Sequence, residues 1–170
     1  MRVGLNGWFM GQAHVGSGQY VHLLRREMAR RRDIACLTFA PTVADVAVPL
    51  RPLVPLAKLW YEQVDLPRAV RSHVDIVHYP YFAAPLVKPC PVVVTILDLI
   101  PFLFPEYTTD VRVKLYNALI AQAARRADAI IAISEHTRRD IMTHLRIPAE
   151  RVHVTYLALD GSFQPPDSGA

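Results

Sequence analysis

Four of the seven glycines lie close together near the start of the 170-residue chain, at Gly7, Gly11, Gly16 and Gly18. They separate a short apolar segment, residues 2–6, from a segment with helical periodicity over residues 20–30. Glycine lets a backbone approach a ligand closely, and a helix N-terminus offers free N–H donors and the positive end of a dipole. This strand-to-helix loop is therefore a candidate site for a phosphate or a sugar. The alternative is a tight turn that binds no ligand.

The loop does not fit the common nucleotide-binding patterns. Val21 stands where a G-x-G-x-x-G pattern starting at Gly16 needs its third glycine, and no acidic residue ends the second apolar run at residues 38–41. A nicotinamide dinucleotide site is therefore not expected, and the chain has no P-loop sequence. The seven histidines show no metal-ligand spacing, and no nucleophile elbow is present. We expect neither a metal ion nor a covalently bound cofactor.

Three further junctions carry side chains that could contact a ligand. Asp98 follows the apolar run 92–97, His78 ends the run 76–78, and Ser134 and Glu135 follow the run 129–133. Each has a structural alternative: Asp98 as a turn or cap residue, Ser134 as a helix N-cap, and Glu135 as a first-turn acid favoured by the helix dipole. We expect His78 to face the cleft at its strand end, with contact to substrate as one of two open interpretations.

These residues need a scaffold that brings strand ends together. Six short apolar runs are predicted as strands, at residues 2–6, 34–39, 76–78, 92–97, 129–133 and 152–156. Helical patterns cover residues 20–30, 56–73 with a break at Pro67, 110–126 and 135–145, whereas residues 41–55 are predicted as a loop. Nearly continuous Val, Ile and Leu runs are typical of strands buried on both faces. The pattern predicts an α/β fold with a Rossmann-like, doubly wound, mostly parallel sheet and ligands at the carboxyl ends of its strands.

Composition narrows the class of protein. The chain is 52% hydrophobic, with a formal net charge of +4, and it shows no nucleic-acid-binding motif. Five arginines, at positions 25, 26, 30, 31 and 32, form either a solvated helix face or a contact for an anionic membrane. Cys36 and Cys90 are expected to be buried free thiols. No leader-like segment and no membrane-spanning run is visible, so we expect a cytoplasmic protein, with peripheral contact at the inner face of the membrane as a further option.

Five segments in order along the chain resemble the N-terminal domain of retaining glycosyltransferases with the GT-B fold, in glycosyltransferase family 4. They are residues 1–20, residues 75–78, the T-x-H-D-L-x-P…F-P-E-like stretch 95–106, the A-D-x-I-I-x-V-S-like stretch 127–140, and residues 152–163 with a G-x-D-x-x-F-like turn. None of these segments is specific alone, and their order over most of the chain makes the signal specific.

The resemblance implies a domain over residues 1–163 that forms the acceptor side of one half of a GT-B enzyme. Residues 164–170 would begin an interdomain linker or tail, and a C-terminal domain carrying an E-x7-E motif would bind most of the nucleotide. The activity implied is transfer of a hexose from a nucleotide-sugar to a glycan or lipid-linked acceptor with retention, as in polysaccharide biosynthesis, and we expect the isolated chain to be inactive. The implied donor- or acceptor-binding residues are Gly16, Ser17, Gly18, Gln19, His78, Asp98, Ser134 and Glu135, with Asp98 as the catalytic candidate.

Two positions depart from the family pattern. Leu97 replaces the usual histidine before Asp98, and a leucine side chain forms no hydrogen bond to a donor sugar. Gln19 stands where an arginine is frequent, which removes a phosphate partner. A nucleotide-sugar epimerase with the same fold and a stand-alone α/β sugar-binding module remain alternatives.

Overall fold

A computed structural model describes residues 1–50, 56–104, 106 and 108–158. Seven strands form one parallel sheet in the order β3-β2-β1-β4-β5-β6-β7. The strands are β1 (Arg2–Asn6), β2 (Ala35–Ala40), β3 (Val46–Ala47), β4 (Ile76–Tyr79), β5 (Val92–Ile96), β6 (Ala129–Ala132) and β7 (Val152–Val154). The doubly wound α/β fold and the six predicted strands are confirmed. The prediction of a loop over 41–55 is wrong at β3, a two-residue edge strand too short to show a pattern.

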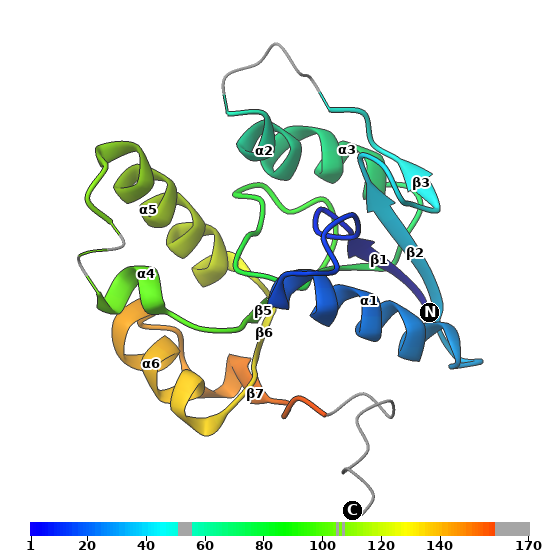
Figure 1. The fold of residues 1–170 in the computed structure, drawn as a ribbon. Helices are drawn as coiled ribbons and strands as arrows, with labels where there is room; N and C mark the ends of the chain where they lie inside the picture. The colour runs from blue at the N-terminus through cyan, green and yellow to red at the C-terminus, as the bar shows by residue number, and fades with distance from the viewer. Residues whose placement is uncertain (51–55, 105, 107, 159–170) are drawn as a thin grey trace, which may run out of the picture.

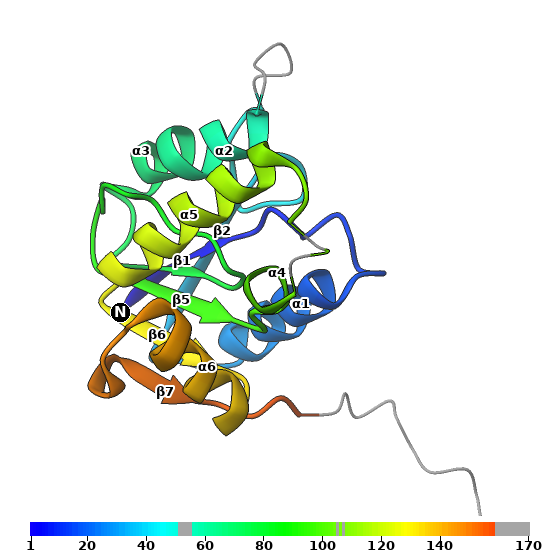
Figure 2. The ribbon, with the colours of Figure 1, turned by 90° about the vertical axis from the view of Figure 1, so that its left-hand side faces the viewer.

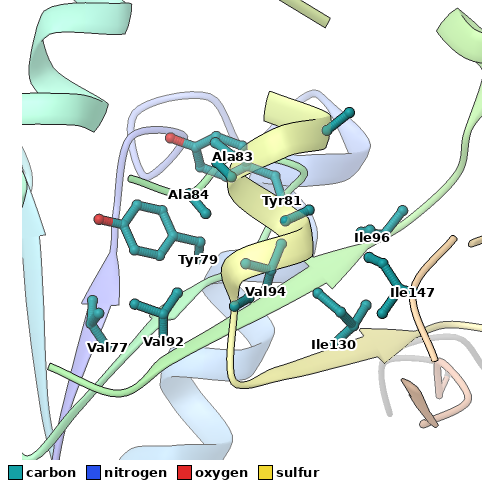
Figure 3. Close-up of a cluster of buried hydrophobic side chains, with 14 of the residues drawn as sticks. Val77, Tyr79, Tyr81, Ala83, Ala84, Val92, Val94, Ile96, Ile130 and Ile147 are labelled. Carbon is teal, nitrogen blue, oxygen red and sulfur yellow. The ribbon is translucent and has the colours of Figure 1, made fainter. Parts of the chain in front are cut away.

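The central strands carry apolar side chains on both faces, as expected for a parallel sheet that helices cover on both sides. In β5, Val92 and Val94 are fully buried, and Val94 pairs in register with Ile130 of β6. Figure 3 shows these side chains packed in one cluster with Val77 and Tyr79 of β4. This cluster is the main core of the domain.

The two faces of the sheet carry different helices. Helix α1 (Gly16–Ala29) covers one face, where Val21 packs against Leu5 and Met10. The opposite face is covered by α2 (Ala57–Trp60), α3 (Leu66–Val70), α5 (Val111–Arg126) and α6 (Glu135–Leu145), as Figure 1 shows. Figure 2 shows α2, α3 and α5 side by side over the sheet. The described residues also form the short helix α4 (Ile100–Leu103) and a 3-10 turn (Ala149–Arg151), neither of them predicted.

Two helix predictions need correction. Helix α1 begins at Gly16, four positions before the predicted start, so Gly16, Ser17 and Gly18 belong to its first turn. The helical segment over 56–73 is not broken at Pro67. A π-helical segment, η1 (Tyr61–Asp65), lies between α2 and α3, and its wider turn accommodates a proline that has no N–H to donate. The other two helices agree with the prediction, α5 capped by Asp110 and α6 by Ser134.

Three further observations concern membrane-spanning helices, metal sites and the two cysteines. No helix in the described part of the chain is long and apolar enough to cross a membrane. No group of three or more His, Cys, Asp or Glu side chains among the residues described could hold a metal ion. Cys36 and Cys90 are separate free thiols, each half-buried rather than buried.

Candidate functional site

The carboxyl ends of the parallel strands place the predicted site residues along one edge of the sheet. After β1, the start of α1 carries Gly16 to Gln19. Asp98 lies in the loop after β5, and Ser134 with Glu135 lies at the start of α6, after β6. This is the edge at which ligands bind in open α/β sheets. The family-like turn with Asp160 and Phe163 and the tail 164–170 lie outside the described residues.

The loop between β1 and α1 is folded tightly against the chain itself. The Gly7 N–H donates to the Phe39 carbonyl at 2.8 Å, and the Gln12 N–H donates to the Phe9 carbonyl at 2.9 Å. A Cβ atom added to Gly18 would lie 1.9 Å from the Gln12 carbonyl oxygen. Glycine is therefore required at position 18 because α1 packs directly on this loop.

Gly16 has a different environment from Gly18. An added Cβ at Gly16 would meet no heavy atom within 4 Å, and the residue is exposed. The N-cap of α1 is Val15, which makes no side-chain capping hydrogen bond, and no acidic residue stands in the first turn. The first N–H groups of an α-helix have no partner within the helix. The exposed start of α1 therefore presents N–H donors at the edge where an anionic ligand would bind.

Asp98 takes the turn role that the sequence left open. Its Oδ1 atom accepts a hydrogen bond from the Ile100 N–H at 3.1 Å, at the start of α4. The side chain is exposed, so a ligand at the carboxyl edge can also reach it. Leu97, the departure from the family pattern, is half-buried and contributes its carbonyl oxygen to a 3.5 Å contact with the Thr137 hydroxyl.

Ser134 and Glu135 take the capping roles expected at a helix start. The Ser134 hydroxyl oxygen accepts from the Thr137 N–H at 3.0 Å and lies 3.0 Å from the Thr137 hydroxyl. Glu135 is exposed, and its carboxylate lies 3.7 Å from the Arg138 guanidinium. Both residues thus contribute to the stability of α6.

His78 lies in the interior of the domain rather than on the open edge. It is 5% exposed, and its Nε2 atom lies 2.8 Å from the Thr95 hydroxyl. The Tyr20 hydroxyl of α1 lies 3.2 Å from the same Thr95 oxygen. Burial lowers the pKa of His78 to about 4, so the ring is neutral near pH 7. Contrary to the expectation, His78 therefore does not face a cleft. It lies beneath α1 and supports the helix through Thr95 and Tyr20.

A buried polar network on the other face was not predicted from the sequence. Asn6 ends β1, and its Nδ2 atom donates to the Tyr81 hydroxyl at 2.8 Å. Its Oδ1 atom accepts from the Trp8 N–H at 3.0 Å, which fixes the first turn of the loop. The Tyr61 hydroxyl donates to the Phe39 carbonyl at 2.8 Å and lies 3.4 Å from Asn6 Oδ1. The network thus anchors the loop that precedes α1.

Glu62 is the charged centre of this network. Its side chain is fully buried on η1, and its two carboxylate oxygens accept from the hydroxyls of Tyr81 at 3.2 Å and Tyr116 at 3.0 Å. The Lys58 ammonium lies 2.9 Å from the same carboxylate and donates to the Tyr116 hydroxyl at 2.7 Å. Burial, and next the charge of Glu62, raise the pKa values of both tyrosines, which remain protonated donors. The i,i+4 spacing of Lys58 and Glu62 is the only sequence signal for this cluster.

Comparison with known proteins identifies the family of the chain. The model of Glycosyltransferase Family 4 matches residues 15–162, a span that contains every predicted site residue. No curated protein matches the chain. Because the family match covers most of the chain and its fold is the parallel α/β sheet expected for half of a GT-B enzyme, the chain belongs to glycosyltransferase family 4.

Proposed function

We propose that this protein transfers a hexose from a nucleotide-sugar to a glycan or lipid-linked acceptor with retention at the anomeric carbon. Family membership over residues 15–162 is the observation that carries the proposal, because it makes the chain part of a glycosyltransferase. The described domain would form the acceptor side of the site. A second domain, with an E-x7-E motif, would hold most of the nucleotide. The proposal requires neither a metal ion nor a bound cofactor.

The start of α1 is proposed to contact the donor phosphate. As the nucleoside diphosphate departs, negative charge grows on its phosphate oxygens, and fixed N–H dipoles aimed at that charge lower the barrier. Exposed Gly16 allows close approach, while Ser17 and Gln19 would add side-chain donors at the same helix end. The absence of a capping side chain at Val15 supports this role, since those N–H groups are not committed elsewhere by a cap.

Asp98 is proposed to bind a sugar hydroxyl beside the reacting carbon. Its exposed carboxylate at the end of β5 supports the proposal, although Oδ1 also holds the Ile100 N–H. Ser134 and Glu135 are proposed as weaker contacts from the end of β6. The buried His78 would act through Thr95 and Tyr20 on the position of α1 and not on the sugar.

The protein is proposed to act in the cytoplasm with peripheral contact to the membrane. The five arginines in and after α1 give this limited support, because several of them form ion pairs. Arg25 is 2.9 Å from Asp45, Arg30 is 2.9 Å from Glu27, and Arg31 is 2.8 Å from Asp33. Such pairing favours the solvated helix face over a strong anionic-membrane contact.

A donor screen on the full-length protein tests the proposed function. Incubation with a panel of nucleotide-sugars and acceptors should give one preferred transfer reaction, and the anomeric proton couplings of the product should show retention. Asp98→Ala should lower turnover at least tenfold, with a melting temperature within about 2 °C of the parent protein. Turnover by the 170-residue chain alone, or an inverted product, would contradict the proposal.

A further inference from the structure

An apolar groove lies between α2 and α5, on the face of the sheet opposite α1. Its cavity has a volume of about 500 Å³ and is lined by Leu56, Leu59, Arg112, Leu115, Tyr116 and Leu119. Figures 1 and 2 both show α2 and α5 side by side at this position. The volume falls within the range of about 300–1,000 Å³ that is usual for small-ligand pockets.

Two of the four leucines that line this groove are left uncovered by the described chain, and Leu59 and Leu119 are half-buried. Leu56 is 66% exposed and Leu115 is 67% exposed, although both stand beside a well-packed core. Val111, one turn before Leu115 on α5, is also exposed. Apolar side chains gathered in this way gain stability when a hydrocarbon covers them.

The charge on the lining of the groove is positive. Arg112 is the only charged side chain that lines it, and no ion pair of its guanidinium is found among the described residues. The neighbouring carboxylates are already engaged, Asp110 as the cap of α5 and Glu62 as the buried partner of Lys58. An exposed lysine, Lys114, adds a second positive charge on the same helix.

Lys58 lies between the groove and the loop that joins β1 to α1. Tyr116 lines the groove, and its hydroxyl accepts from the Lys58 ammonium at 2.7 Å. That ammonium lies 6.0 Å from the centre of the Phe9 ring, in the loop between β1 and α1. The wall of the groove formed by Tyr116 is therefore linked through Lys58 to the loop that precedes α1.

We propose that the α2–α5 groove binds the hydrocarbon chain of a lipid-phosphate acceptor, with the phosphate held by Arg112. This inference rests on the proposed function, because it names the chemical class of the acceptor. Six lining residues and a single cation suit a chain with one anionic head group. A protein helix or a second copy of this chain would need an interface of about 1,000 Å² or more.

Titration calorimetry of the purified chain with monomeric alkyl phosphates tests the proposal. Dodecyl phosphate should bind, and decyl phosphate, two methylenes shorter, should bind about fifteenfold more weakly, since each buried methylene contributes roughly fourfold in affinity. Inorganic phosphate should show no measurable binding, and dodecyl maltoside should bind more weakly than dodecyl phosphate. Equal affinity for dodecyl phosphate and dodecyl maltoside, or no effect of chain length, would overturn the proposal.

Matched variants locate the site. Leu115→Asp should abolish dodecyl phosphate binding, while Val87→Asp, at a site that is 77% exposed and remote in sequence, should leave it unchanged. Arg112→Gln should weaken binding about tenfold and remove the preference over dodecyl maltoside, whereas Arg139→Gln on α6 should do neither. Circular dichroism checks the fold of each variant. Wild-type affinity in Leu115→Asp would show that the chain binds elsewhere.

Two further arms separate this proposal from related ones. Binding to phosphatidylglycerol vesicles without binding of monomeric dodecyl phosphate would mean a membrane-surface contact and would overturn the acceptor proposal. Transfer by the full-length protein to soluble glycans, without alkyl phosphate binding, would overturn this inference and leave the proposed function standing. Groove-dependent binding without any transfer would support the groove and count against the proposed function.

Discussion

The β1–α1 and β6–α6 junctions lie at the same edge of the sheet, yet their helix ends are treated differently. At α6, Ser134 caps the first turn at 3.0 Å, and Glu135 adds a favourable charge. At α1, Val15 makes no side-chain cap, and no acidic residue follows. Where nearby side chains cap the first N–H groups of a helix, those side chains are explained by the stability of the helix. An end left without such a cap keeps donors for a ligand, so the comparison favours the β1–α1 junction as the binding region.

The largest expected effect concerns the packing of α1 on its loop. Gly18→Ala places a Cβ atom against the Gln12 carbonyl, so the loop or the helix must move, at a cost of about 3 kcal/mol in free energy of unfolding. Thermal unfolding should show a melting temperature lower by about 6–12 °C. Gly16→Ala, in open space on the same helix, should be neutral or slightly stabilising. Equal melting temperatures for the two variants would remove the distinction between the glycines.

The next effect concerns the support beneath α1. The folded-state pKa of His78, about 4, is below the unfolded value near 6.5, so the unfolded chain binds a proton first as the pH falls. Stability should therefore be lost between pH 6.5 and pH 4, by about 2 kcal/mol from pH 7 to pH 5. His78→Gln, which keeps a polar side chain facing Thr95, should remove this part of the slope in urea denaturation. Identical pH profiles for the two proteins would place the titration elsewhere.

A smaller effect should follow from removal of the α6 cap. Ser134→Ala leaves the Thr137 N–H without its acceptor and should lower the free energy of unfolding by about 1 kcal/mol. Ser134→Asp restores an acceptor and should recover most of the loss. If α6 is scaffold, turnover of the full-length protein should change little in either variant. A large fall in turnover with unchanged stability would instead make Ser134 a main contact of the site rather than a weaker one.

A cap added to α1 should cause the smallest change in stability. It is also the most direct test of the difference between the starts of α1 and α6. Val15 has the extended backbone of an N-cap, so Val15→Asp should stabilise the helix by about 0.5 kcal/mol. The new carboxylate would occupy the first-turn N–H groups and repel a phosphate. Calorimetry of the full-length variant should show a lower affinity for the nucleotide-sugar, and its melting temperature should rise slightly. Unchanged affinity would mean that this helix end does not bind the donor.

Sequence patterns identified most of the scaffold because buried parallel strands consist of runs of Val and Ile, as in Val92–Ile96. They missed the true start of α1 because glycine is a poor helix former, and packing on residues 7–12 overrides that preference. The side on which His78 points was also beyond reach, since a continuous apolar run carries no alternation to assign its faces. The Glu62 network was missed because it joins residues from four separate segments.

The anchoring of the loop between β1 and α1 also has a consequence for the order in which contacts can form during synthesis. Asn6 leaves the ribosome early, but its partner Tyr81 is 75 positions further along the chain. The Glu62 carboxylate likewise waits for Tyr116, 54 positions later. Helix α1 can form from local contacts before then, whereas contacts this distant in sequence form slowly. The proposed binding loop therefore cannot acquire its full set of anchoring contacts until Tyr81 and Tyr116 have been synthesised.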